Sequence, residues 1–204
     1  MEDIKNIKSI INMCYSDKYE IMELNERHLY INSIIDEVVI DTIVYHILRY
    51  NREDIGIPKE ERKPIKLYIN SNGGDVYNGW GLISAITSSI TPIYTINQGM
   101  CASMAFLIFI AGEKRYSMEN SVFLMHEGFT GGFDNTSKMR DRMEFETNQL
   151  EEHTKKFVLK QTSIDDKYYD LKYRIEWYML PIEAKENGIC DYIVGKDCSI
   201  DEIL

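Results

Sequence analysis

The sequence is poor in cysteine, and its cysteines form no recognisable motif. Its 204 residues include only four, Cys14, Cys101, Cys190 and Cys198, with no CxxC pair and no histidine at the spacing of a metal ligand. The sequence therefore predicts neither a zinc site nor a disulfide framework. We expect most of these thiols to be reduced and packed, as in a cytoplasmic protein.

The sequence also lacks a long apolar run and a secretory leader. Its longest apolar stretch, Met100 to Gly112, has about 13 residues, whereas a transmembrane helix needs about 20. The first residues, MEDIKNIKSIINMCY, bring acidic side chains early and interrupt a short apolar stretch, which is not the layout of a signal peptide. We expect no membrane role.

Basic residues are the minority among the charged ones. The chain has 33 Asp and Glu against 23 Lys and Arg, for a formal net charge of −10. Nucleic-acid binding relies on clustered Lys and Arg, so this balance argues against nucleic acid as the main partner. With 44% hydrophobic residues, a chain of this length suits one α/β domain with a short appendage.

The apolar pattern predicts strands that alternate with helices. The predicted strands are Leu29–Ile35, Lys66–Asn70, Ile93–Asn97, Ser121–Met125 and Ile189–Val194, and the predicted helices are Val38–Arg49, Asp75 to before Pro92, Ser103–Ala111, Lys138–Gln161, Ile164–Tyr173 and Pro181–Gly188. Residues 51–64, which contain two prolines, are predicted as a loop, and Gln98–Ala102 as a turn. Three successive strand–turn–helix units favour a parallel sheet with crossover helices.

Two segments lie outside this regular pattern. Residues 1–27 are polar and weakly periodic, so we interpret them as an N-terminal arm with a short helix at Ile4–Met13. In the long charged helix, Met143, Leu150 and Phe157 recur every seven residues. Such a narrow seam indicates a protruding helix that packs against one partner, although an ordinary surface helix lying on its own domain is the alternative.

Two glycine-containing turns follow core strands and carry the candidate chemistry. They are SNGGD at residues 71–75 and GMCASMA at 99–105, and in a parallel sheet they would meet at one edge and offer backbone N–H groups to an oxyanion. Ser103 lies in the second turn, where it is either a nucleophile or simply a helix N-cap; no GxSxG elbow is present. His126 follows an apolar strand and is either a general base or a rim histidine.

Three segments in this order resemble the proteolytic subunit of the Clp protease, a family of serine peptidases. They are LYINSNGGDVYNGWGLISAI, QGMCASMAFLIFIAGEKRY and FLMHEGF, which are similar to that family's SPGG, GMAASMG and MxHQP motifs. The resemblance covers about residues 28–195. It implies a crotonase-like fold of repeated ββα units in a catalytic domain at 28–204, with the helix at about 138–161 as the handle through which two heptameric rings stack.

The resemblance also implies roles for individual residues. Ser103 corresponds to the nucleophile and His126 to the general base, and the backbone N–H groups of Gly74 and Met104 correspond to the oxyanion hole. An extended substrate would lie as an added strand between two segments, Asp75–Val76 and Glu127–Gly128. The family has an aspartate where this chain has Glu176, and Asp170 is the nearest upstream alternative. The resemblance implies no metal or cofactor.

Departures from the family's motifs leave several functions open. Asn72 replaces a proline, Glu127–Gly128 replaces Gln-Pro, and the N-terminal arm does not resemble the loops that engage a ring-shaped AAA+ unfoldase. A divergent or phage-type member would have these features. We therefore consider an endopeptidase acting on polypeptides as a heptamer or tetradecamer, a catalytically impaired structural subunit, a phage capsid-maturation protease, and a crotonase-type acyl-CoA enzyme.

Overall fold

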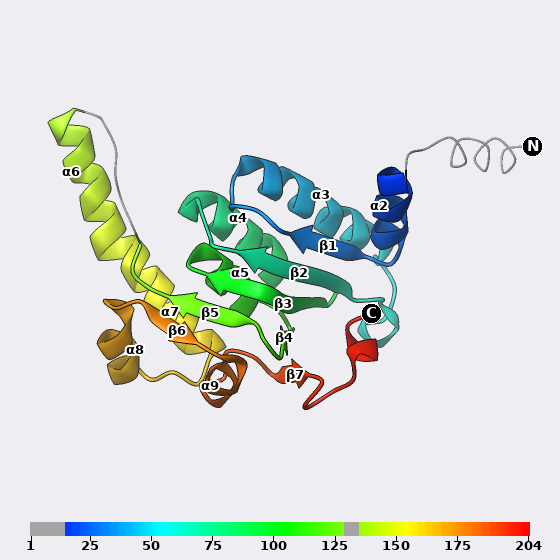
Figure 1. Ribbon diagram of the computed structural model, residues 1–204. Helices are drawn as coiled ribbons and strands as arrows, with labels where there is room; N and C mark the ends of the chain where they lie inside the picture. Colours follow the sequence, from blue (N-terminus) through cyan, green and yellow to red (C-terminus); the bar gives the residue numbers. More distant parts are fainter. Residues whose placement is uncertain (1–14, 129–134) are drawn as a thin grey trace, which may run out of the picture.

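The computed structural model describes residues 15–128 and 135–204, and it contains one seven-stranded sheet (Figure 1). Five strands follow the order β1-β2-β3-β4-β7, while β5 pairs with β3 and β6 pairs with β5. The strands are β1 (His28–Ile31), β2 (Ile65–Ser71), β3 (Ile93–Ala102), β4 (Lys114–Met118), β5 (Val122–Met125), β6 (Trp177–Met179) and β7 (Tyr192–Val194). Every pairing is parallel except β5–β6, which confirms the predicted parallel sheet.

Helices cover one face of the sheet and one of its ends. They are α2 (Tyr15–Asn25), α3 (Glu37–Glu53), α4 (Val76–Thr87), α5 (Met104–Ile110), α6 (Thr136–Phe145), α7 (Glu151–Gln161), α8 (Asp166–Tyr173) and α9 (Pro181–Glu186). Of these, α3, α4 and α5 lie along the sheet, and their apolar sides form the main core with its buried Ile and Leu side chains (Figure 1). This mixed α/β architecture agrees with the expected crotonase-like fold.

No helix in the described part of the chain is both long and apolar enough to cross a membrane.

Aspartates set the starts of several helices. Asp36 accepts a hydrogen bond from the Val39 backbone N–H at 3.0 Å and caps α3, while Asp75 accepts from the Asn78 N–H at 2.8 Å and caps α4. Each of these carboxylates satisfies a backbone donor that the first helical turn leaves without an intrahelical partner.

Strand β3 is longer than predicted, because the predicted turn at Gln98–Ala102 is a bulge within the strand. Up to Asn97, β3 pairs with β4, and from Met100 onward it pairs with β5. The Asn97 side-chain oxygen accepts from the Gly99 N–H at 3.1 Å, and the Asn70 oxygen accepts from the Met100 N–H at 3.1 Å. These amides satisfy the backbone donors at the irregular position, so the strand continues to Ala102.

Other differences concern short elements without a clear periodic signal. Strands β4 and β6 were not predicted, and β1 ends at Ile31 rather than Ile35. Helix α3 continues to Glu53, inside the predicted 51–64 loop, which also contains a 3₁₀ turn at Lys59–Glu61. A strand as short as β6 offers too few residues to show alternation, so pairing with β5 decides its conformation.

The N-terminal arm contains a helix that the sequence analysis did not predict. Helix α2 ends beside β1, and the Tyr50 hydroxyl on α3 donates to the Leu24 carbonyl at 2.6 Å. Leu24 also packs against the main core. The predicted helix at Ile4–Met13 lies outside the described residues.

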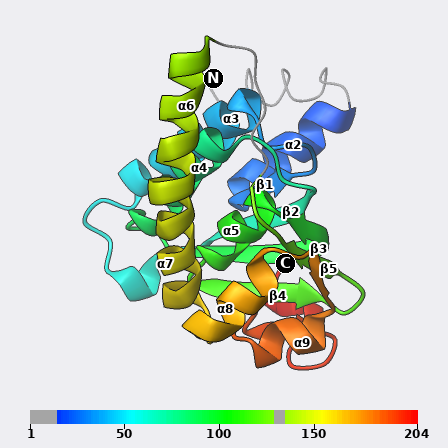
Figure 2. The ribbon, with the colours of Figure 1, turned by 90° about the vertical axis from the view of Figure 1, so that its left-hand side faces the viewer.

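The predicted long helix is present and begins at Thr136 rather than Lys138. It consists of α6, a π-helical turn at Glu146–Leu150, and α7. Its last turns lie on their own domain, because Phe157 packs edge-on against Trp80 of α4 at 5.2 Å between ring centroids. None of the α6 residues is buried, and Figure 2 shows α6 extending beyond the body of the domain. The end of the long helix at α7 therefore lies on its own domain like an ordinary surface helix, whereas α6 protrudes. A partner that packs against α6 stays a prediction.

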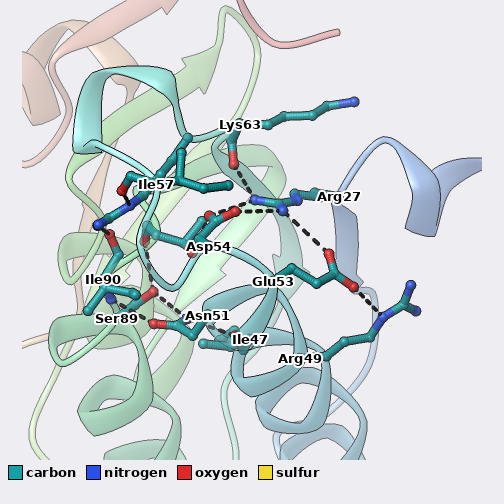
Figure 3. A network of polar contacts seen from close by, with 12 residues as sticks. Arg27, Ile47, Arg49, Asn51, Glu53, Asp54, Ile57, Lys63, Ser89 and Ile90 are labelled. Carbon is teal, nitrogen blue, oxygen red and sulfur yellow. Dashed lines mark hydrogen bonds and ion pairs between the residues drawn. The ribbon is translucent and has the colours of Figure 1, made fainter.

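A buried ion pair joins four segments at the edge of the sheet near β1 (Figure 3). Arg27 donates to both carboxylate oxygens of Asp54, at 2.8 and 2.9 Å, and to the carbonyl of Lys63 at 2.8 Å. The Thr91 hydroxyl donates to the same carboxylate at 2.7 Å. Asp54 is only 1% exposed. The Arg27 guanidinium and the Thr91 hydroxyl hold the pKa of Asp54 below its usual value.

Replacing Asp54 should therefore destabilise the fold. We expect D54N to lower the free energy of unfolding by about 3 kcal/mol, because the largely buried Arg27 loses its counter-charge. Asp54 stabilises the fold when it is ionised, so the difference between wild type and D54N should be constant from about pH 5 to 8 and shrink below about pH 4. Urea denaturation at each pH measures it.

Glu53 supplies the matched control. It contacts the same arginine at 3.4 Å, but its side chain is 44% exposed, so E53Q should cost less than about 1 kcal/mol. Equal effects of D54N and E53Q would contradict the assignment of the stabilising role to the buried pair.

Candidate active site

Ser103 occupies the sharp turn between β3 and α5 in a conformation that non-glycine residues rarely adopt. Its φ is 53° and its ψ is −122°, a combination outside the regions favoured by L-residues. Its backbone N–H donates to the Leu124 carbonyl at 2.9 Å, which anchors the turn to β5. Although Ser103 precedes the helix, its side chain makes no capping hydrogen bond. Ser103 therefore holds the N-cap position of α5, but its side chain does not cap the helix.

The glycine pair of the SNGGD turn lies directly against the serine turn. A Cβ on Gly73, whose φ is +96°, would lie 2.8 Å from the Ser103 Cβ and 3.0 Å from the Met104 backbone N. A Cβ on Gly74, whose φ is +151°, would lie 2.3 Å from the Ile35 carbonyl oxygen. Only glycine fits at either position without moving the backbone.

The same turn forms a parallel bridge to Ile35, and this bridge orients the Gly74 backbone. The Ile35 N–H donates to the Gly73 carbonyl, and the Asp75 N–H donates to the Ile35 carbonyl, both at 2.8 Å. In a parallel bridge the central residue directs its own N–H and C=O to the opposite side. The Gly74 N–H therefore points away from Ile35.

His126 follows β5 and comes close to Ser103 through the pairing of β5 with β3. Ala102 is opposite Leu124 in this parallel pairing. The segments that follow β3 and β5 therefore leave the sheet at the same edge. Both residues, together with Gly74 and Met104, line one pocket of about 260 Å³. The structure thus brings four sequence-predicted residues around a single cavity.

The segments predicted to hold substrate border the same pocket. Asp75, Val76 and Gly128 line it, and Glu127 is exposed beside His126. The Asp75 carboxylate caps α4 and its N–H is bonded to Ile35, so both of these groups have a role in holding the turn.

The two carboxylates considered as the third catalytic group differ in position. Glu176 precedes β6, and the antiparallel pair Met125–Trp177 places it opposite His126 if the register is continued by one residue. Its exposed carboxylate accepts a hydrogen bond from the Tyr178 hydroxyl at 3.3 Å, and Glu176 does not line the pocket. Asp170 instead pairs with Lys155 of α7 at 2.7 Å.

The sequence analysis did not predict the residues that form the inner wall of the pocket. Its inner wall comes from α5, α7 and α8 through Phe106, Val158, Tyr169 and Tyr173, and the π-helical turn forms another side. The two tyrosines are one helical turn apart on α8 and so lie on the same side of this helix. This spacing was the only sign in the sequence that they could line one wall together. Nothing in the sequence indicated that α8 lines the same pocket as the two glycine-containing turns.

Comparison with known proteins identifies the family. The model of the Clp protease family matches residues 13–197. The chain belongs to the Clp protease family. This membership confirms the resemblance inferred from the three motifs and makes the chain a member of a serine peptidase family.

Its similar relatives are distant in sequence, and the match covers most of the length of two of the three. The ATP-dependent Clp protease proteolytic subunit 1 of Prochlorococcus marinus is 29% identical over 85% of this chain and 86% of its own length. The ATP-dependent Clp protease proteolytic subunit of Deinococcus radiodurans is 25% identical over 85% and 82%. The chloroplastic subunit 3 of Arabidopsis thaliana is 28% identical over 85% of this chain and 54% of its own length.

The close approach of the glycine turn to Ser103 leads to a stability prediction. G73A should cost at least about 2 kcal/mol, because alanine is strained at this φ and its Cβ would collide with the Ser103 turn. Thermal or urea unfolding measures the loss.

Gly81, on the exposed side of α4, is the matched control. A Cβ there would meet no atom within 4 Å, so G81A should raise the stability by about 0.5–1 kcal/mol. A G73A protein as stable as wild type would show that the turn relaxes and that Gly73 is not needed.

Proposed function

We propose that the chain is a serine endopeptidase that cleaves unfolded polypeptides or peptides, with Ser103 as nucleophile and His126 as general base. One observation supports this most directly: a serine held at positive φ, without a capping role, shares a pocket with a histidine and two backbone turns. Membership of the Clp protease family adds to this support.

The proposed mechanism follows from these positions. His126 takes the hydroxyl proton of Ser103 as the oxygen attacks a peptide carbonyl, and the backbone N–H groups of Gly74 and Met104 stabilise the oxyanion. In other acyl-transfer enzymes, one such donor contributes about 3–4 kcal/mol to the transition state. His126 then protonates the leaving amine, and water hydrolyses the acyl-enzyme.

We assign the orienting carboxylate to Glu176. Its register position opposite His126 supports this assignment, and a glutamate can orient the imidazole of a serine hydrolase. Asp170 is less suitable because it forms an ion pair with Lys155.

We further propose that the chain works as a homo-oligomer of one or two heptameric rings in the cytoplasm. The protruding α6, with Met143 52% exposed, supports a contact between subunits at this helix. The substrate would lie extended along Val76 on one side and Glu127–Gly128 on the other, as an added strand. An AAA+ unfoldase is the partner type that the names of the ATP-dependent relatives suggest.

A structural subunit without activity is the second candidate. The exposed position of Glu176, hydrogen-bonded to Tyr178 rather than lining the pocket, favours it. In that case the same fold would assemble beside an active relative. Activity of the pure chain separates the two candidates.

The first test is labelling of the assembled protein with a fluorophosphonate. We expect one modified serine per chain, at Ser103, because this serine lines the same pocket as the proposed base. S103A should abolish labelling and lower peptide hydrolysis by about 10⁶-fold, and H126A should lower it by a similar factor. An intact oligomer that leaves Ser103 unmodified and cleaves no peptide would refute the proposed function.

The second test separates the two carboxylates. E176Q should lower kcat by about 10⁴-fold with little change in KM, because loss of the orienting charge favours the wrong imidazole tautomer. D170N, which removes an exposed carboxylate from an ion pair on α8, should leave kcat nearly unchanged. The reverse order of the two effects would assign the role to Asp170.

A further inference from the structure

Asn97 is a buried asparagine of β3, at the point where this strand changes its partner. It is opposite Ser117 in the last pair with β4, and Met100 is opposite Val122 in the first pair with β5. Asn97 is 0% exposed. A buried carboxamide needs hydrogen-bond partners for both its oxygen and its nitrogen, so the partners of this side chain show what it holds together.

The two ends of the Asn97 side chain contact different strands. Its Oδ1 atom accepts a hydrogen bond from the Gly99 N–H at 3.1 Å, within the bulge of β3, and its Nδ2 atom donates to the Val122 carbonyl at 3.0 Å. Val122 is the first residue of β5. One side chain therefore ties the irregular part of β3 to the start of the strand that leads to His126.

Strand β5 is short, so each of its anchors has a large share in placing it. It has four residues, with three residue pairs to β3 and three to β6. At its far end, the Ser103 N–H donates to the Leu124 carbonyl. His126 lies four residues beyond Val122, a reach of about 13 Å in an extended chain. A shift of Val122 along the strand would therefore be carried to the imidazole.

We propose that Asn97 is a positioning residue that sets the approach of the Ser103 hydroxyl to the His126 imidazole. Its bond to Gly99 holds the bulge that directs β3 toward β5, and its bond to Val122 fixes β5 along β3. Proton transfer from the serine needs the two side chains within hydrogen-bond reach. The catalytic consequence rests on the proposed peptidase function, whereas the relative position of the two side chains does not.

Two substitutions separate the two hydrogen bonds. N97S can keep the bond to the Gly99 N–H, because a serine hydroxyl can accept from the backbone two residues further on, but it lacks the amide nitrogen that reaches Val122. N97A loses both bonds. Both variants should lower kcat by about 10²-fold with KM within twofold of wild type, because a misplacement of about 1 Å has an effect of this size. N97S should be the more stable of the two in urea.

N51A is the matched control for a loss of stability alone. The Asn51 side chain on α3 is also bonded at both ends (Figure 3). Its Nδ2 atom donates to the Ile47 carbonyl and the Ser89 hydroxyl, at 2.7 and 2.8 Å. Its Oδ1 atom accepts from the Ile90 N–H at 2.7 Å, before β3 begins. N51A should therefore destabilise the fold and leave kcat within twofold of wild type.

The kinetic comparison has two outcomes that would overturn the proposal. One is a wild-type kcat in N97S, which would show that the link to β5 does not position the site. The other is an equal fall of kcat in N51A and N97A, which would show that a general loss of stability lowers the activity.

A thiol in place of the serine tests the geometry without peptide hydrolysis. An imidazolium beside a cysteine lowers the pKa of its thiol below the usual value of about 8.5. The rate of iodoacetamide alkylation of S103C against pH therefore reports how close His126 lies, and mass spectrometry assigns the alkylation to residue 103. Adding N97S to S103C should raise this pKa toward 8.5, as H126A should, whereas N51A should leave it unchanged.

This measurement separates the proposal from the proposed function. If the wild-type chain cleaves no peptide but the thiol pKa depends on Asn97, the peptidase proposal fails and the positioning role stands. The same thiol pKa with and without N97S would overturn the positioning role, whether or not the chain is a peptidase.

Discussion

The geometry of the candidate site depends on the bulge at which β3 changes partner. Strand β3 leaves β4 after Asn97 and joins β5 at Met100, and this shift carries Ser103 to the strand that ends in His126. Two asparagines hold the bulge, and Gly99 allows it, because a Cβ there would lie 2.8 Å from the Asn70 side-chain oxygen. Without this irregularity, β3 would continue beside β4 and deliver the serine elsewhere.

The second requirement is the close contact between two backbone turns. Gly73 and Gly74 fit between Ile35 on one side and the Ser103 turn on the other, with no room for a side chain. This contact fixes the Gly74 N–H relative to Met104 at a position set by backbone alone. Oxyanion stabilisation needs donors that are already in place before the reaction, and packed backbone provides this better than mobile side chains.

The long helix links the pocket to the outside of the domain. Its last turns pack on α4 and α5, with Val158 buried and Phe157 against Trp80. Its π-helical turn lies where it borders the pocket, and α6 then projects beyond the body (Figure 2). Such turns often occur at functional sites. A contact made by α6 with another subunit would therefore act on the same element that shapes the pocket.

The sequence by itself determined the α/β class, the parallel sheet and most helices, because apolar periodicity is a local signal. Three motifs, at Gly74, Ser103 and His126, also identified the family and the residues that share the pocket. The tertiary structure alone decided the extension of β3 through its bulge, the short strands β4 and β6, the burial of Tyr169 beneath the site and the exposed position of Glu176. These features depend on contacts between residues far apart in the chain, and a hydroxyl or carboxylate has the same local sequence signal whether it is buried, paired or exposed.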